Sequence, residues 1–188
     1  MDPLSLFSEQ VREQATRIAE SGPVALSGLF DLTSHRLHRY AITITRNQHD
    51  SEDVVQAVLV QVAARPQLLA SVDHPWHYLL QMIRNRALLV VRNRKKSFSI
   101  ANLCDLLTRT SVDELEVEDT YRVVWTALRK LPTDQSEVVV LKIWEGMTFS
   151  QIANVLDQTP STVASRYRYA MEKLARHFDS KHPEVNHE

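Results

Sequence analysis

The sequence predicts an all-α protein made of two small helical domains. Only three glycines occur in the 188 residues, too few for the many turns of an all-β protein. Long segments carry apolar residues at helical spacing, and the few helix breakers fall between these segments. The composition, with 44% hydrophobic and 24% charged residues, is that of a globular chain.

The first half of the chain contains four predicted helices, the first of which ends near Gly22-Pro23. In the second, we expect an inward face made of Leu29, Phe30, Leu37, Tyr40, Ala41 and Ile44. The third begins at Asp50 with capping residues and stops before Pro66; its valines would suit a strand, but its length and capped start favour a helix. Pro75 fits the first turn of the fourth. The predicted helices are residues 3–20, 26–46, 50–65 and 74–96.

Charge separates the middle of the chain into two parts. No acidic residue occurs between Asp73 and Asp105, a window that contains six cations. From Ser97 to Glu118 the helical periodicity fades and acidic residues accumulate, so we expect a flexible acidic linker there. A basic block beside an acidic one indicates two differently specialised segments.

The second half of the chain has clear helix boundaries. Leu131-Pro132-Thr133 divides two predicted helices, residues 121–130 and 134–145, and Gly146 fits a C-cap. Thr148 and Gln151 form the pattern of a capping box. Asp157-Gln158-Thr159 then makes a turn, after which Thr159 can cap a helix that starts at Pro160.

The last helix is predicted to have two different faces. Val163, Tyr167, Ala170 and Leu174 share an inward face, whereas hydroxyl and basic side chains face out. Two short helices joined by such a turn are typical of a helix-turn-helix, whose second helix enters the major groove. Arginine suits guanine edges, and serine or threonine suits bases or phosphates. An ordinary helical hairpin with a solvated charged face is the alternative at this point.

The segment from Leu131 to Leu174 resembles region 4 of bacterial RNA polymerase sigma factors of the extracytoplasmic-function (ECF) group. The matching pattern is Leu-Pro, an apolar helix, a glycine, Ile-Ala and then Thr-Val-x-Ser-Arg. Three positions depart from the family. Asp157 replaces a glycine in the turn, Ala164 replaces a common lysine, and Leu89, in the first half, replaces a common aspartate.

The first half resembles region 2 of the same family. "HDSEDVVQ" matches the Asp-x-Glu-Asp-x-x-Gln segment, and "PWHYLLQMIRNRALLVVRNRKK" matches the Trp-Leu-x-x-Ile-x-x-Asn segment with trailing arginines. The resemblance covers residues 26–178. It implies a region 2 domain at 26–97, an acidic linker at 98–119 and a region 4 helix-turn-helix at 120–180, preceded by a helical extension at 1–25.

The resemblance implies a promoter-specificity subunit that binds core polymerase, reads the −10 and −35 elements and helps to melt DNA. The implied −35 contacts are Ser161, Thr162, Ser165, Arg166, Arg168, Tyr169 and Lys173. The implied −10 contacts are Arg84, Asn85, Arg86, Arg92, Arg94 and Lys95. The implied polymerase contacts are Asp50, Glu52, Asp53 and Gln56. The valines of the same helix and Trp76 are expected in the core.

The implied partners are promoter DNA, the β′ clamp helices and β flap of core RNA polymerase, and in some relatives an anti-sigma factor. No cofactor or metal is expected, and no catalytic residue. The N-terminus lacks the apolar run of a signal peptide, and no stretch approaches the length of a membrane span. The protein is therefore expected in the cytoplasm, without membrane insertion.

Two other functions fit parts of the sequence. One is an operator-binding helix-turn-helix regulator with an N-terminal sensor or dimerisation domain, which leaves the basic helix unexplained. The other is an enzyme or metal protein, suggested by the pairs His35/His38 and His74/His77. No carboxylate or cysteine completes a ligand set for either pair. The single cysteine, Cys104, excludes an internal disulfide.

Overall fold

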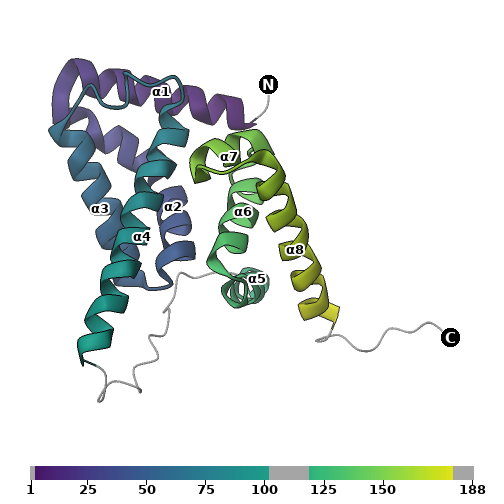
Figure 1. Cartoon of the computed structure of the whole chain (residues 1–188). Helices are drawn as coiled ribbons and strands as arrows, with labels where there is room; N and C mark the ends of the chain where they lie inside the picture. The colour runs from purple at the N-terminus through teal and green to yellow at the C-terminus, as the bar shows by residue number, and fades with distance from the viewer. Residues whose placement is uncertain (1–2, 102–118, 180–188) are drawn as a thin grey trace. The chain divides into compact units, whose positions relative to one another are not determined.

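A computed structural model describes residues 3–101 and 119–179, and in these ranges the chain is helical without strands (Figure 1). It divides into two compact units, Met1–Val112 and Asp113–Glu188. The all-α prediction is thus confirmed. Most of the predicted acidic linker, together with Cys104, lies outside the described residues.

In its described residues, the first unit contains four α-helices and one short 3-10 helix. Helices α2, α3 and α4 run side by side, and α1 packs across one end of them against α2 and α4 (Figure 1). Their bounds are α1 Pro3–Ser21, η1 Gly22–Ala25, α2 Leu26–Thr45, α3 Gln48–Ala64 and α4 Pro75–Ala101. Helix α4 therefore continues four residues into the range predicted as linker.

Helix α1 belongs to the core of this unit. Phe7, Val11, Ala15 and Ile18 recur at helical spacing, and all four are buried. The Phe7 ring meets the Trp76 ring edge-on, with 4.9 Å between centroids. The N-terminal extension, which lies outside the family resemblance, is therefore part of the helical bundle and packs against the start of α4.

Helix α3 begins at Gln48, two residues earlier than predicted, and Asn47 caps it instead of Asp50. The Asn47 side chain accepts a hydrogen bond from the backbone N–H of Asp50 at 2.9 Å, which satisfies one of the free donors of the first turn. The helix ends at Ala64, before Pro66, as predicted. Its core side chains are the five expected ones, Val54, Val55, Val58, Leu59 and Val62.

The second unit contains α5 Asp119–Lys130, α6 Thr133–Ile143, α7 Phe149–Leu156 and α8 Pro160–Asp179. Helix α6 ends two residues before the predicted Glu145, and Gly146 beyond it has a positive φ of 58°. Three consecutive valines, Val138–Val140, are buried here together with Leu141. Helix α8 packs against both α6 and α7.

The turn between α7 and α8 has the predicted geometry. Thr148 and Gln151 form the capping box at the start of α7. Asp157 ends the helix in the left-handed conformation, with φ 52°, a conformation that aspartate adopts more readily than most residues. The Thr159 hydroxyl accepts from the N–H of Thr162 at 3.2 Å and caps α8. Both helix ends at this turn are thereby fixed.

Candidate functional site

The first surface is the outward face at the start of α8. Its apolar side is anchored by Val163, Ala170 and Leu174, which are buried, while the predicted inward Tyr167 is only half-buried and lies beside Phe149. The exposed members of the predicted −35 set are Ser161, Ser165, Arg168, Tyr169 and Lys173. Thr162 and Arg166 are half-buried.

The two arginines of this face differ in their surroundings. Arg166 lies 3.4 Å from Asp134 of α6, and its side chain is 26% exposed. The Arg168 side chain is 65% exposed and approaches Glu172 only to 3.9 Å. Its guanidinium also lies 4.9 Å from the Tyr169 ring centre. Because Arg168 is held more weakly and is better exposed, it is the more available of the two for a ligand.

The second surface is the basic face of α4. Asn85, Arg86, Arg92 and Arg94 are exposed and Arg84 is half-buried; Lys95 lies outside the residues whose side chains the structure describes. Arg86 lines a shallow hollow of about 510 Å³ together with Asp53 and Gln56 of α3. Predicted DNA-binding and polymerase-binding residues therefore share one hollow between α3 and α4.

The third surface is the acidic face of α3. Glu52, Asp53 and Gln56 are exposed. Asp50 differs from them, since its side chain is only 25% exposed and pairs with Arg94 at 2.8 Å. The predicted polymerase set is thus three exposed residues, of which Glu52 accepts a hydrogen bond from Gln48 of the same helix, and Asp50, which pairs with α4.

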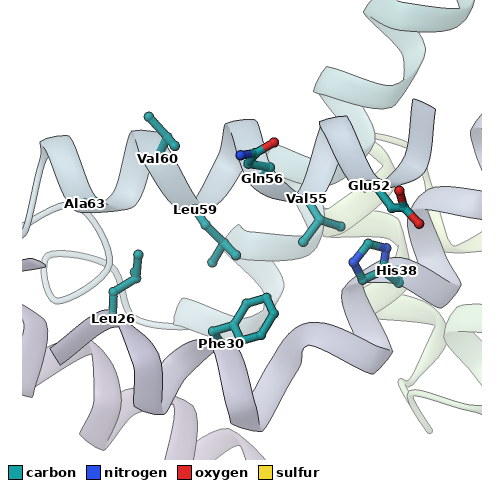
Figure 2. A pocket seen from close by; sticks show the side chains of 9 residues that line it. All are labelled: Leu26, Phe30, His38, Glu52, Val55, Gln56, Leu59, Val60 and Ala63. Atoms are coloured by element: carbon teal, nitrogen blue, oxygen red, sulfur yellow. The ribbon is translucent and has the colours of Figure 1, made fainter. Parts of the chain in front are cut away.

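An apolar groove between α2 and α3 adjoins this acidic face and was not predicted (Figure 2). We call it the α2–α3 groove; it has a volume of about 350 Å³. It is lined by Leu26, Phe30, His38, Glu52, Val55, Gln56, Leu59, Val60 and Ala63. The prediction that Phe30 points inward was wrong, because its ring is 45% exposed in this groove. Val60 on the opposite wall is 61% exposed.

Two aromatic residues form a further half-exposed feature, in the second unit. Trp125 of α5 stacks on Trp144 just after α6, with ring centroids 5.6 Å apart. Neighbouring Val123 and Ile143 are 42% and 51% exposed.

Trp76 of the first unit is only 3% exposed, which confirms the prediction that it belongs to the core.

The histidines do not gather with further ligands. Among the described residues, no three His, Cys, Asp or Glu side chains lie close enough to hold a metal ion. Burial lowers the pKa of His38, an effect that Glu52 opposes and His35 assists. Burial and the nearby His74 lower the pKa of His77. In the described ranges, no helix combines the length and apolar character of a membrane span.

Comparisons with known proteins assign both units. Residues 29–97 match the family model "Sigma-70 region 2", and residues 121–174 match "Sigma-70, region 4". The ECF RNA polymerase sigma factor SigL of Mycobacterium tuberculosis is 24% identical over 156 residues, covering 79% of this chain and 86% of SigL. The sigma factor SigK of Mycobacterium ulcerans is 25% identical over 180 residues, covering 92% of this chain and 96% of SigK.

Two solved structures have the same fold. One is CnrH in complex with the cytosolic domain of CnrY, with a TM-score of 0.62 and 23% identity, covering 90% of this chain and 97% of CnrH. The other is the sigma factor RpoE of Bartonella quintana in complex with the anti-sigma factor NepR. It has a TM-score of 0.63 and 20% identity, covering 80% of this chain and 94% of RpoE.

Proposed function

The chain belongs to the sigma-70 family of RNA polymerase sigma factors, in its ECF group, and from this premise we propose which of its surfaces bind each partner. As a sigma factor it is a non-enzymatic, promoter-specificity subunit that binds core RNA polymerase and promoter DNA. The operator-binding alternative is not favoured, because region 2 accounts for the basic helix that this alternative leaves unexplained.

The outward face of α8 reads the −35 element. The observation that carries this proposal is the exposure of Ser161, Ser165 and Arg168 at the start of a helix whose opposite side is buried. Helix N-terminal N–H groups favour a phosphate, and arginine and serine suit base edges in the major groove. Arg166 contributes less than Arg168, since Asp134 holds it.

The basic face of α4 holds the −10 DNA. Asn85, Arg86 and Arg92 are exposed there, and exposed cations bind the backbone of single or double strands. Trp76 takes no part in base recognition, since it is packed against Phe7.

Glu52, Asp53 and Gln56 bind the β′ clamp helices of the polymerase. The α2–α3 groove supports this proposal, because an exposed apolar surface beside carboxylates suits a partner with apolar and basic side chains. In the second unit, Trp125, Trp144 and Ile143 form the surface that we assign to the β flap. We place the protein in the cytoplasm, where the polymerase acts.

An anti-sigma factor is a further partner in this proposal. It is supported by the solved complexes of CnrH with CnrY and of RpoE with NepR. The domain boundaries at 26–97 and 120–180 are likewise proposed, with support from the family matches at 29–97 and 121–174.

The test is run-off transcription with purified core polymerase and a promoter library. We expect transcripts that depend on this protein. Arg168→Ala should weaken promoters through their −35 element by about tenfold or more, the loss typical of one base-contacting arginine. Arg17→Ala is the matched control, because Arg17 is an exposed arginine of α1 paired with Glu13. Equal effects of both variants, or no gain of start sites, would contradict the proposal.

A further inference from the structure

We infer that Arg94 is a positioning residue that, together with Asp50, fixes the C-terminal half of α4 to the turn between α2 and α3. We call this pair and the Thr45 carbonyl the α4 staple. The inference changes the role of both side chains, since Arg94 then positions the DNA-binding helix and Asp50 is not a polymerase contact. It rests on the proposed function in taking α4 as the DNA-binding helix and α3 as the polymerase-binding helix.

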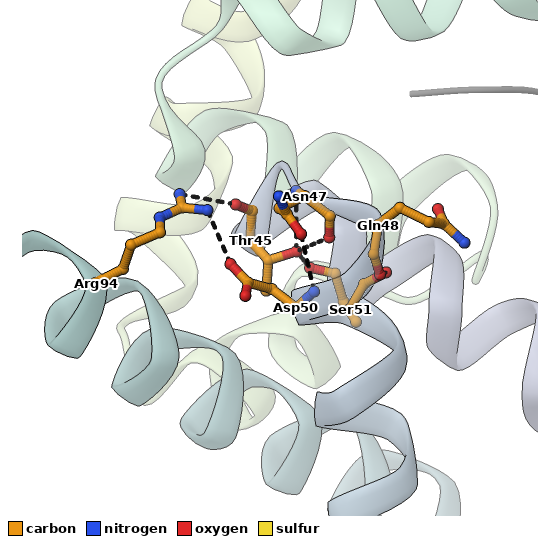
Figure 3. A network of polar contacts seen from close by, with 7 residues as sticks. Thr45, Asn47, Gln48, Asp50, Ser51 and Arg94 are labelled. Carbon is orange, nitrogen blue, oxygen red and sulfur yellow. Dashed lines mark hydrogen bonds and ion pairs between the residues drawn. The ribbon is translucent and has the colours of Figure 1, made fainter. Parts of the chain in front are cut away.

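The contacts of Arg94 join the ends of two other helices (Figure 3). Its Nη1 donates to Asp50 Oδ2 at 2.8 Å, and its Nη2 donates to the backbone oxygen of Thr45 at 3.2 Å. Thr45 is the last residue of α2, where carbonyls lack helical partners and a cation is stabilising. Asp50 lies in the first turn of α3, where a carboxylate is stabilising. One guanidinium thus contacts both helix ends.

The turn that receives Arg94 is held by its own hydrogen bonds. Only Arg46 and Asn47 separate α2 from α3. Arg46 has a φ of 55°, and its N–H donates to the oxygen of Ile42 at 2.9 Å. Asn47 accepts from the N–H of Asp50, and the Thr45 hydroxyl donates to the oxygen of Ala41 at 3.1 Å. Asp50 and the Thr45 carbonyl are therefore presented to Arg94 by a fixed backbone.

The position of Arg94 along α4 gives the staple its importance. The buried side chains of α4 end at Ala87. Beyond it, none of the α4 side chains that the structure describes is buried, and Arg92 is exposed. Arg94 lies about two helical turns past Ala87. Its contacts therefore set the direction of the basic end of α4 relative to α3.

The direction in which one substitution changes promoter affinity distinguishes this positioning role from a simple electrostatic effect. Asp50→Asn removes a negative charge, so weaker repulsion of phosphates would strengthen promoter binding. The staple predicts the opposite. Preformed holoenzyme should bind promoter DNA about two- to fivefold more weakly, the range for a partly exposed ion pair, and affinity for core polymerase should stay unchanged. A merely structural role would lower both affinities.

Glu52→Gln is the matched control, because it removes the same charge from the same helix, and the Glu52 side chain contacts Gln48 and His49 of α3 itself. We expect this variant to weaken core polymerase binding and to leave promoter binding by preformed holoenzyme unchanged. If Asp50→Asn behaves like Glu52→Gln, or strengthens promoter binding, the staple is wrong.

A double-mutant cycle gives the second measurement. Asp50→Asn and Arg94→Gln are combined, and promoter affinity of the holoenzyme and thermal unfolding of the free protein are recorded. The staple predicts that the double variant loses no more promoter affinity and no more stability than the more impaired of the two single variants. The reason is that either change breaks the same contact. Additive losses would refute it.

The unfolding arm of the cycle needs no partner. If core polymerase affinity does not change in Glu52→Gln and Asp53→Asn, this result counts against the proposed function of α3. Coupling between Asp50 and Arg94 in the unfolding of the free protein would still support the staple. The two proposals can therefore fail separately.

Discussion

At the scale of single residues, two histidines of the first unit lie in surroundings that lower their pKa. His38 lines the α2–α3 groove and His77 lies in the first turn of α4. The pKa of each is lowered below 6.5, chiefly by burial. Glu52 opposes the effect at His38, but burial outweighs it. Neither histidine completes a metal-ligand set among the described residues. We therefore expect their lowered pKa values to affect the stability of the folded protein.

The lowered pKa values predict how stability depends on pH. As pH falls through about 6.5, the unfolded chain binds protons at these histidines before the folded one does. The free energy of unfolding should therefore fall with decreasing pH, and the loss should end once pH has passed below the folded pKa values. The double variant His38→Gln/His77→Gln should show a weaker dependence of the free energy of unfolding on pH, measured by denaturant titrations at several pH values. His49→Gln, at a highly exposed side chain, should leave it unchanged.

At the scale of elements, α1 connects sequence outside the region 2 match to α4, the helix that we propose binds DNA. The match begins at residue 29, yet Val11, Ala15 and Ile18 are completely buried. Phe7 contacts Trp76 and lies beneath the guanidinium of Arg36, 4.0 Å from its ring centre. Helix α1 is therefore a structural support for the start of α4.

Removing the Phe7 ring should destabilise the first unit. We expect Phe7→Ala to lower the free energy of unfolding by about 3 kcal/mol, as for other large-to-small core changes. Leu6→Ala changes the neighbouring, 48% exposed side chain and should cost within about 0.5 kcal/mol. Denaturant unfolding measures both. Equal losses would show that α1 does not pack through Phe7 in solution.

At the scale of the whole molecule, each unit has a core of its own. Leu79 in α4 and Leu141 in α6 are both completely buried, in different units. In the proposed function each unit binds one of two promoter elements, and separate cores suit this arrangement. The same organisation predicts two separate unfolding events.

Calorimetry of the full chain tests this separation. Leu79→Ala should lower only the unfolding temperature of the first unit, and Leu141→Ala only that of the second. Each substitution should lower the free energy of unfolding of its unit by about 3 kcal/mol. A single transition that both substitutions shift equally would mean that the units unfold together.

Local rules made much of the second unit predictable. The capping box at Thr148 and Gln151, the left-handed Asp157 and the Thr159 cap each depend on residues only a few positions apart. Such contacts form within one turn of helix, so their sequence pattern specifies them directly. The exposed face of α8 follows from the same helical spacing.

The all-α class and the order of the helices were set by the sequence alone, because composition, spacing and caps act locally. The candidate surfaces were implied by the resemblance to sigma factors. Only the tertiary structure decided that Phe30 faces a groove, that α1 completes the core and that Arg94 reaches Asp50, 44 positions away. These depend on how helices pack, and helical periodicity says which side chains share a face but not which neighbour that face meets.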